Sequence, residues 1–477
     1  MDSIKSIQKG AEMKYQPDTS FRFIAIQSPA AAKDPTTRRL ARSHAIKQAI
    51  RAKRELQERQ NAKSPSITHE SPHNKTAGSP SSTTSALSPS SKLFDLQTID
   101  ASRLKALIKQ NSERQAAEPV FSLQEDVVEF QAFESVFLTG VDDPALLNAV
   151  MLTFALGVTD GNINQECLGY LNRATKSIRE RMDRPENAAS VAVIGAILLL
   201  AGVEARLGMR SQVQLHMKAI HQLLQLCSDE NIYLNGSIKR AIFWQDLNCA
   251  VIAGSPRLFD HTTFVELEWR RDPFTPNFYT LSPGFRARAH LFPDEFIRVL
   301  EDTHALQCIR DSPNFGCRDT GEMMRYDSHQ GSVQSRLVDL PKDSLFLECC
   351  YLAIYISACQ LCSKAWKALA IPGHLSTVLL EKLRQADING VWDDDPDLFL
   401  WLLYTGGAYL STGPTRSAYI ALINQKLSYG FGSPYKSMPT VLRIFKMFVW
   451  SGEAFSAEVE RFWAETNKTQ LGTYDRE

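Results

Sequence analysis

The stretch that decides the fold of this chain is residues 186–227, ENAASVAVIGAILLLAGVEARLGMRSQVQLHMKAIHQLLQLC. Apolar side chains recur in it at spacings of three and four residues, which is the period of a helix with an apolar face. The pattern predicts one helix over 186–206 and a second over 211–227. The connection between them is so short that the two helices must pack antiparallel.

The first of these helices contains the longest uncharged apolar run of the chain, residues 188–203. That run is shorter than the ~20 residues needed to span a bilayer, and Glu204 and Arg206 close it. We therefore expect a buried core helix. The expected facing side chains are Val191, Ile194, Leu198 and Ala201 on the first helix, and Val213, Met217, Ile220 and Leu224 on the second.

Helical patterns continue over most of the chain from residue 93 onward. Further helices are expected over 237–253, 293–310, 342–369 and 396–410. Residues 255–292 are rich in proline and aromatic side chains and predict an irregular crossing. The whole chain has 44% hydrophobic residues, which supports a folded body, and residues 93–477 are expected to fold as one large all-α, multi-helix domain of antiparallel helices.

The front of the chain differs sharply in charge. Residues 1–92 hold 16 basic and 7 acidic residues, a net of +9, and because the whole chain holds 53 of each, the remainder carries −9. Residues 1–60 are expected to form a basic arm that is mostly disordered or conditionally helical. Residues 61–92 form a Ser/Pro-rich linker, whose composition cannot bury enough apolar surface to fold.

The positive charge of the arm suits binding to nucleic acid or to a receptor, but the arm lacks the features of a structure that reads DNA sequence. Its basic residues would surround a helix on every side, and no leucine heptad follows Arg59. The spacing of its basic clusters is that of a bipartite nuclear import signal, and the same charges would contact DNA phosphates non-specifically. The residues assigned to import or phosphate contact are Arg38, Arg39, Arg42, Arg51, Lys53 and Arg54.

Four serines in the linker each precede a proline. They are Ser64, Ser71, Ser79 and Ser88. Phosphorylation of these serines would add about −1.5 to −2 charge each, enough to offset much of the charge of the arm. They are the expected modification sites.

Two side-chain clusters invite a metal interpretation. Asp393, Asp394 and Asp397 match the DDxxD arrangement that binds magnesium in helical prenyl-diphosphate enzymes, but Pro396 inside it is typical of the first turn of a helix. We expect Asp395 to cap that helix and Asp397 to complement its dipole.

Cys359 and Cys362 form a CxxC without a second ligand pair, so buried thiols are expected instead of a zinc site. His216 and His221 are five residues apart and do not share a helical face, and His216 is expected to be a capping or packing residue. No phosphate-binding glycine loop, dinucleotide fingerprint, HExxH or GxSxG is present. The sequence therefore predicts no catalytic residue, no metal and no cofactor.

At this point the chain resembles a known group, the fungal-specific transcription-factor-like proteins, whose helical regulatory domain often follows a zinc cluster. The resemblance lies in segments that occur in family order: Leu171-Asn172-Arg173-Ala174, residues 191–208 with Glu204, His216-Met217-Lys218-Ala219-Ile220, Asp397-Leu398-Phe399-Leu400-Trp401 with Gly406-Gly407, and Phe448-Val449-Trp450 through Phe455 to Phe462-Trp463. At the front, Phe21-Arg22-Phe23-Ile24, Pro29 and Arg42-Ser43-His44 resemble one subgroup of that family.

The chain departs from the family at the zinc cluster, because its first cysteine is Cys167. The resemblance implies nuclear regulation of transcription, while sequence-specific DNA binding by a zinc cluster is not carried over. The expected function is a nuclear, fungal-type transcription regulator that is not an enzyme and has no zinc-cluster DNA-binding domain.

Two alternatives remain open: a nuclear co-regulator or interaction scaffold that does not bind DNA, and, more remotely, a helical metal-dependent enzyme. Expected partners are DNA through the arm, an import receptor and other transcription regulators, with no membrane partner. The sequence leaves the oligomeric state undetermined.

Overall fold

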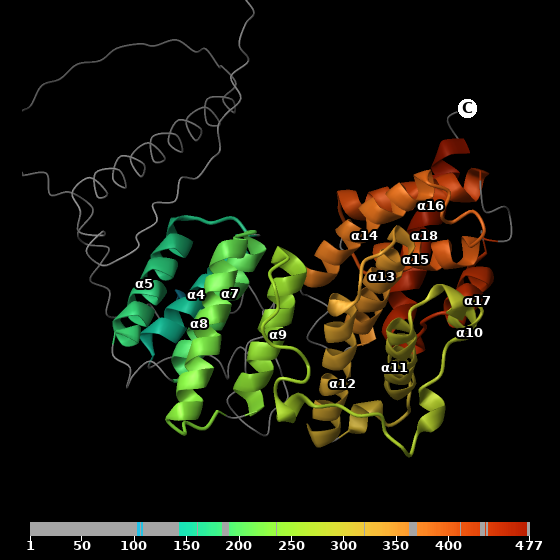
Figure 1. Cartoon of the computed structure of the whole chain (residues 1–477). Helices are drawn as coiled ribbons and strands as arrows, with labels where there is room; N and C mark the ends of the chain where they lie inside the picture. Colours follow the sequence, from blue (N-terminus) through green and yellow to red (C-terminus); the bar gives the residue numbers. More distant parts are fainter. Residues whose placement is uncertain are drawn as a thin grey trace, which may run out of the picture. The chain divides into compact units, whose positions relative to one another are not determined.

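The structure of the protein is a computed structural model (Figure 1). It describes residues 103–104, 106–107, 143–159, 161–183, 190–234, 236–318, 320–361, 370–410, 412–429, 435 and 437–474. All of these lie in the compact unit Phe94–Glu477. The expected arm, the linker and their assigned residues lie outside the described part of the chain.

The described residues are all-helical, as the sequence predicts, and contain no β-strand. The first helices are α4 Pro144–Val158, α5 Gln165–Met182, α7 Val191–Arg206, α8 Arg210–Asp229 and α9 Gly236–Ala253. After the irregular crossing come α11 Asp294–Arg310, α12 Thr320–Asp339, α13 Leu345–Leu361, α14 Ala370–Ile388, α15 Pro396–Ala408, α16 Pro414–Tyr429, α17 Met438–Met447 and α18 Gly452–Tyr474. In this described part, no helix is both long and apolar enough to cross a membrane.

The helix pair predicted from residues 186–227 is confirmed, but α7 begins at Val191 and not at residue 186, since the backbone of Ser190 is extended. Ser190 caps α7 by accepting the main-chain N–H of Val193 at 3.2 Å, and α7 is buried on all sides from Val193 to Ala205. Gly208, with φ of +71°, ends α7 in a left-handed conformation that costs glycine little. The chain then turns into α8, which packs on α7.

Most side chains predicted for this helix pair are buried. On α8 the buried residues are Val213, Met217, Ile220, Leu223 and Cys227, so Leu223 takes the place predicted for Leu224, which is half-buried. On α7, Val191 is half-buried as well. The helical period thus located the contact face to within one residue.

The irregular crossing predicted over residues 255–292 is also confirmed, and we call these residues the crossing segment. Its short helical turns are η2 Val265–Leu267, η3 Pro276–Phe278, α10 Pro283–Arg286 and η4 Ala289–Leu291. The helix predicted over 342–369 is α13, and residues 362–369 lie outside the described part. The helix predicted over 396–410 is α15.

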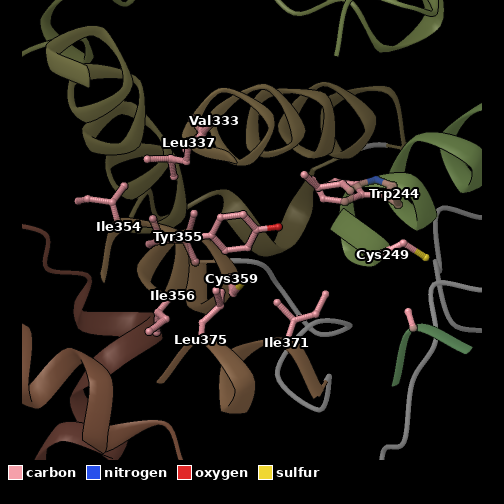
Figure 2. Packing of buried hydrophobic residues seen from close by; sticks show 14 of the residues in the cluster. Trp244, Cys249, Val333, Leu337, Ile354, Tyr355, Ile356, Cys359, Ile371 and Leu375 are labelled. Atoms are coloured by element: carbon pink, nitrogen blue, oxygen red, sulfur yellow. The ribbon is translucent and has the colours of Figure 1, made fainter. Parts of the chain in front are cut away.

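Helix α9 connects two sets of helices within this unit (Figure 1). On one side it contacts α7 and α8, and on the other it contacts α12 and α14. Figure 2 shows the core there, with Trp244 of α9, Val333 and Leu337 of α12, and Tyr355 and Cys359 of α13. The contacts of α9 therefore join the early helices to the later ones.

The last helices pack closely around α15. Arg416, only 4% exposed, donates to the main-chain oxygens of Gly407, Ala408 and Leu410 at 3.0, 2.9 and 2.8 Å. The same guanidinium forms two bonds to the carboxylate of Glu465 on α18. Arg416 thus satisfies the free carbonyls at the end of α15 and fixes that end to α18.

Candidate functional site

The most unusual part of the described structure is the middle of α12. Residues 326–335 are ten consecutive buried residues, and seven of them are polar: Asp327, Ser328, His329, Gln330, Ser332, Gln334 and Ser335. Burying polar side chains is costly unless each finds a partner. The charged partners come from α9, α11 and the crossing segment, whereas Gln334 bonds to Cys359 of α13 and the Gln330 amide has no partner among the described residues. We call Arg240, Asp246, Trp269, Asp302, Asp327, His329 and the arginines Arg257, Arg271 and Arg336 the polar joint.

Asp327 connects α12 to α9. Its Oδ2 lies 2.7 Å from Nη1 of Arg240 and 3.4 Å from Nε1 of Trp244, and both residues of the ion pair are buried. Arg240 also donates to the main-chain oxygen of Glu266 at 3.0 Å. Burial raises the pKa of the Asp327 carboxyl, while the charge of Arg240 opposes that shift.

Asp246 fastens the start of the crossing segment to α9. Its Oδ2 accepts the main-chain N–H groups of Leu258 and Phe259, each at 3.1 Å, and lies 3.5 Å from Nε of Arg257. Burial raises the pKa of Asp246 to about 6, although these hydrogen bonds and Arg257 favour the charged form.

Arg257 continues the connection from the crossing segment to α12. Its Nη1 donates to Oγ of Ser335 at 2.6 Å and lies 3.3 Å from Oδ2 of Asp339. His261 Nδ1 lies 3.1 Å from the same Ser335 hydroxyl, and burial lowers the pKa of His261. The Ser335 hydroxyl of α12 therefore contacts two side chains of the crossing segment, Arg257 and His261.

Asp302 on α11 bridges two arginines. Nε of Arg271 lies 2.8 Å from its Oδ1, and Nη2 of Arg336 lies 2.5 Å from its Oδ2. Burial raises the pKa of Asp302, and both arginines oppose that shift. The crossing segment, α11 and α12 thus meet at one carboxylate.

His329 lies flat against Trp269 of the crossing segment, with ring centroids 3.8 Å apart and planes inclined by 7°. Burial and the charge of Arg336 hold the pKa of His329 well below its usual range. The imidazole is therefore neutral and packs as an aromatic ring. The polar joint pairs its carboxylates with arginines and connects four elements: α9, α11, α12 and the crossing segment.

The two aspartates predicted to cap α15 and to complement its dipole both have side-chain partners. Asp395 does precede α15, but its side chain does not cap the helix, because it lies 2.6 Å from the Arg288 guanidinium of the crossing segment. That part of the prediction was wrong. Asp397 is in the first turn as predicted and accepts a hydrogen bond from the Tyr435 hydroxyl at 2.9 Å.

In the structure, the side chains of His216 and Cys359 contact neighbouring helices. Nε2 of His216 lies 2.9 Å from Oε2 of Glu204, which joins α8 to α7. Cys359 is buried and accepts a hydrogen bond from Gln334 at 3.2 Å, whereas Cys362 lies outside the described residues. Among the residues that the structure describes, no group of three or more His, Cys, Asp or Glu side chains is placed to hold a metal ion.

Several segments that carry the family resemblance form packing contacts. Arg173 of α5 donates to Oδ1 of Asn148 on α4 at 2.8 Å. A Cβ atom on Gly406 would lie 2.2 Å from the Tyr419 hydroxyl, and one on Gly407 would lie 2.3 Å from the Phe462 ring. No family model, curated protein or solved structure matches the chain.

The polar joint itself was missed at the sequence level. Its α12 residues are polar and gave no apolar face, and the partners Arg257 and Arg271 come from a segment without a regular period. The sequence feature that could have indicated the polar joint is the number of charged side chains close to Trp244 and Trp269 in residues 240–271.

Proposed function

We propose that the protein is a nuclear transcription regulator of fungal type that acts without a zinc-cluster DNA-binding domain. The observation that carries the proposal is the separation of charge, with a net of +9 on residues 1–92 and −9 on the rest of the chain. A concentrated positive charge attracts nucleic acid and import receptors, while the helical body contributes surfaces for other proteins.

The polar joint supports a regulatory role for the body. It connects α9 with α12, and α9 in turn contacts α7 and α8. Interactions of this kind, in which several elements share buried charges, couple the stability of one set of helices to that of the other. A regulatory domain needs such coupling to pass an event on one surface to another.

The arm is assigned two uses, nuclear import and phosphate contact. If about six of its charges contact DNA phosphates, the logarithm of affinity falls with the logarithm of salt concentration at a slope near −5. Phosphorylation at Ser64, Ser71, Ser79 and Ser88 would weaken that binding through added negative charge.

The DNA-binding test compares two variants of the full chain, each of which loses three positive charges, one in the arm and one in the helical body. One variant carries Arg38→Gln, Arg39→Gln and Arg42→Gln. Its control carries Lys176→Gln, Arg270→Gln and Arg461→Gln, whose side chains are 78%, 82% and 62% exposed in the helical body. Binding to a fluorescent duplex is measured by anisotropy across a salt series.

We expect the arm variant to lose about three units of salt slope, because each phosphate contact contributes about 0.9. The control should keep the slope of the unmodified chain. Equal slopes for both variants would contradict phosphate contact by the arm.

The alternative is a nuclear co-regulator that does not bind DNA and uses the arm for import alone. It predicts a nuclear reporter signal that requires Arg38, Arg39, Arg51, Lys53 and Arg54, with no duplex binding at moderate salt. Genome-wide chromatin mapping of the tagged full chain separates the two further. Discrete, arm-dependent sites support the regulator, and a diffuse, arm-independent signal opposes it.

A further inference from the structure

The turn between α11 and α12 places a serine beside arginine side chains. Ser312 follows the end of α11, and its Oγ accepts a hydrogen bond from Nη2 of Arg318 at 3.0 Å. The guanidinium carbons of Arg310 and Arg318 lie 4.6 and 5.6 Å from the centre of the Phe315 ring. The ring is therefore a common platform for two cations, one of which, Arg318, contacts the Ser312 hydroxyl.

Both arginines have unused hydrogen-bonding capacity. Nε of Arg310 and Nε of Arg318 are buried and have no hydrogen-bond partner among the residues the structure describes. The nearest acidic residue in the sequence, Asp311, accepts a hydrogen bond from the Ser451 hydroxyl. An oxyanion at Ser312 would supply the acceptors that the guanidinium groups lack.

The turn is held lightly enough for an enzyme to open it. Its main-chain bonds run from Ser312 N–H to the Ile309 oxygen at 3.2 Å and from Phe315 N–H to the Ser312 oxygen at 3.0 Å. Residues 311, 313, 314 and 316 are exposed, and Ser312 is half-buried. Short exposed turns of this kind open locally at low free-energy cost.

The dipeptide Ser312–Pro313 is the pattern that proline-directed kinases modify, since proline fixes the backbone after the serine and removes an N–H. The described part of the chain has two other Ser-Pro dipeptides, beginning at Ser255 and Ser282. Those serines are 7% and 5% exposed. Burial thus separates Ser312 from the other described candidates.

We propose that Ser312 is a phosphorylation site and that Arg310 and Arg318 hold the phosphate. A Ser/Thr kinase transfers the γ-phosphoryl group of ATP to Oγ of Ser312, the bond to the ADP oxygen breaks, ADP leaves, and the hydroxyl proton passes to the aspartate base of the kinase. The phosphate brings about −1.5 to −2 charge and three acceptor oxygens. Two guanidinium groups outweigh the repulsion from Asp311.

The modification would act on the polar joint through its covalent connection. Residues 311–319 join α11, which carries Asp302, to α12, which carries Arg336 and Asp327. A phosphate bound by Arg310 and Arg318 ties the end of α11 to the start of α12. It therefore restricts the relative movement of the helices whose carboxylates and arginines meet in the joint.

The first experiment asks whether the folded protein is a substrate. The purified full chain is incubated with a proline-directed Ser/Thr kinase and magnesium ATP, and peptides are read by mass spectrometry. We expect phosphate on Ser312, none at that position in Ser312→Ala, and about tenfold less in Pro313→Ala. Modification of a synthetic peptide of residues 306–320 without modification of the folded chain would overturn the site.

The second experiment tests the two arginines. The full chain carrying phosphoserine only at position 312 gives a single ³¹P resonance, which is titrated with pH. Free phosphoserine has a second pKa near 6, and we expect it to fall by about one unit beside two guanidinium groups.

The variants Arg310→Gln and Arg318→Gln should each return the phosphate pKa toward its free value, and Arg318→Lys should do so only in part. Arg461→Gln, on the exposed face of α18, is the control and should change nothing. A free-like phosphate pKa in the unmodified arginine background would overturn the proposed role of Arg310 and Arg318.

Discussion

Arg240 and Asp327 form an ion pair of 2.7 Å in which both residues are buried, and this pair joins α9 to the polar middle of α12. Trp244 adds an N–H bond to the same carboxylate oxygen. The same two helices are also in close packing, since a Cβ on Gly331 would lie 2.9 Å from the Phe243 ring and 3.4 Å from the Trp244 ring. Disruption of the ion pair should affect both sets of helices at once.

The first prediction concerns this pair. Asp327→Ala leaves a buried guanidinium without its counter-charge, so we expect the free energy of unfolding to fall by about 3–5 kcal/mol. Replacing both residues, as Arg240→Met with Asp327→Leu, should cost much less than the sum of the two single changes. Urea unfolding followed by circular dichroism measures Asp327→Ala, the single variants Arg240→Met and Asp327→Leu, and the double variant.

A matched control is the exposed pair Arg270 and Glu268, with side chains 82% and 47% exposed. Arg270→Ala should change the free energy of unfolding by less than about 1 kcal/mol. If the two single changes at Arg240 and Asp327 simply added in the double variant, the buried pair would not be an energetic unit.

The second prediction is a pH dependence set by Asp246. Its pKa is about 6 in the folded protein, against 3.8 for an unperturbed aspartate, so between these values the folded state keeps a proton that the unfolded state has lost. Stability due to this group is therefore greatest below about pH 4 and falls as the pH rises to about 6, by about 3 kcal/mol.

Asp246→Asn removes this titration, while the amide oxygen still accepts the N–H groups of Leu258 and Phe259. The difference in unfolding free energy between the unmodified protein and Asp246→Asn should fall as the pH rises from 4 to 6 and then level off. His261 and His329, whose lowered pKa values have the opposite pH dependence, are present in both proteins, so their contribution cancels. A difference that is flat with pH would show that Asp246 keeps an ordinary pKa.

The hairpin of α7 and α8 follows from the sequence because α7 is a continuous apolar run and the buried residues of α8 are apolar and recur with the helical period. The middle of α12 does not, since seven of its ten consecutive buried residues are polar and a hydrophobicity pattern assigns such residues to the surface. Two of them, Asp327 and Ser335, have as partners Arg240 and Arg257, which come from other elements. The path of the crossing segment, which brings Arg257 and Trp269 there, has no period from which it could be predicted.

The third prediction uses Gln330, whose side-chain nitrogen and oxygen are buried without a hydrogen-bond partner among the described residues. Gln330→Met keeps a side chain of similar length and removes the two buried polar atoms that lack a hydrogen-bond partner. We therefore expect the free energy of unfolding to rise by about 1 kcal/mol. Gln334→Met, four residues along the same helix, should not gain, because Gln334 donates to Cys359 at 3.2 Å. Thermal unfolding compares the two, and equal changes would contradict the assigned difference.

The fourth prediction tests whether close packing explains the glycines at positions 406 and 407 of α15. A Cβ on Gly406 would lie 2.2 Å from the hydroxyl of Tyr419, which itself donates to the Ser376 main-chain oxygen at 2.7 Å. Gly406→Ala must move that ring and break that bond, so we expect a loss of about 2–3 kcal/mol. Gly373→Ala, in α14 with nothing within 4 Å of the added carbon, should be neutral or gain up to about 1 kcal/mol. If both alanine variants melted at the same temperature, close packing of α15 against α16 would not be the reason for the glycine at position 406.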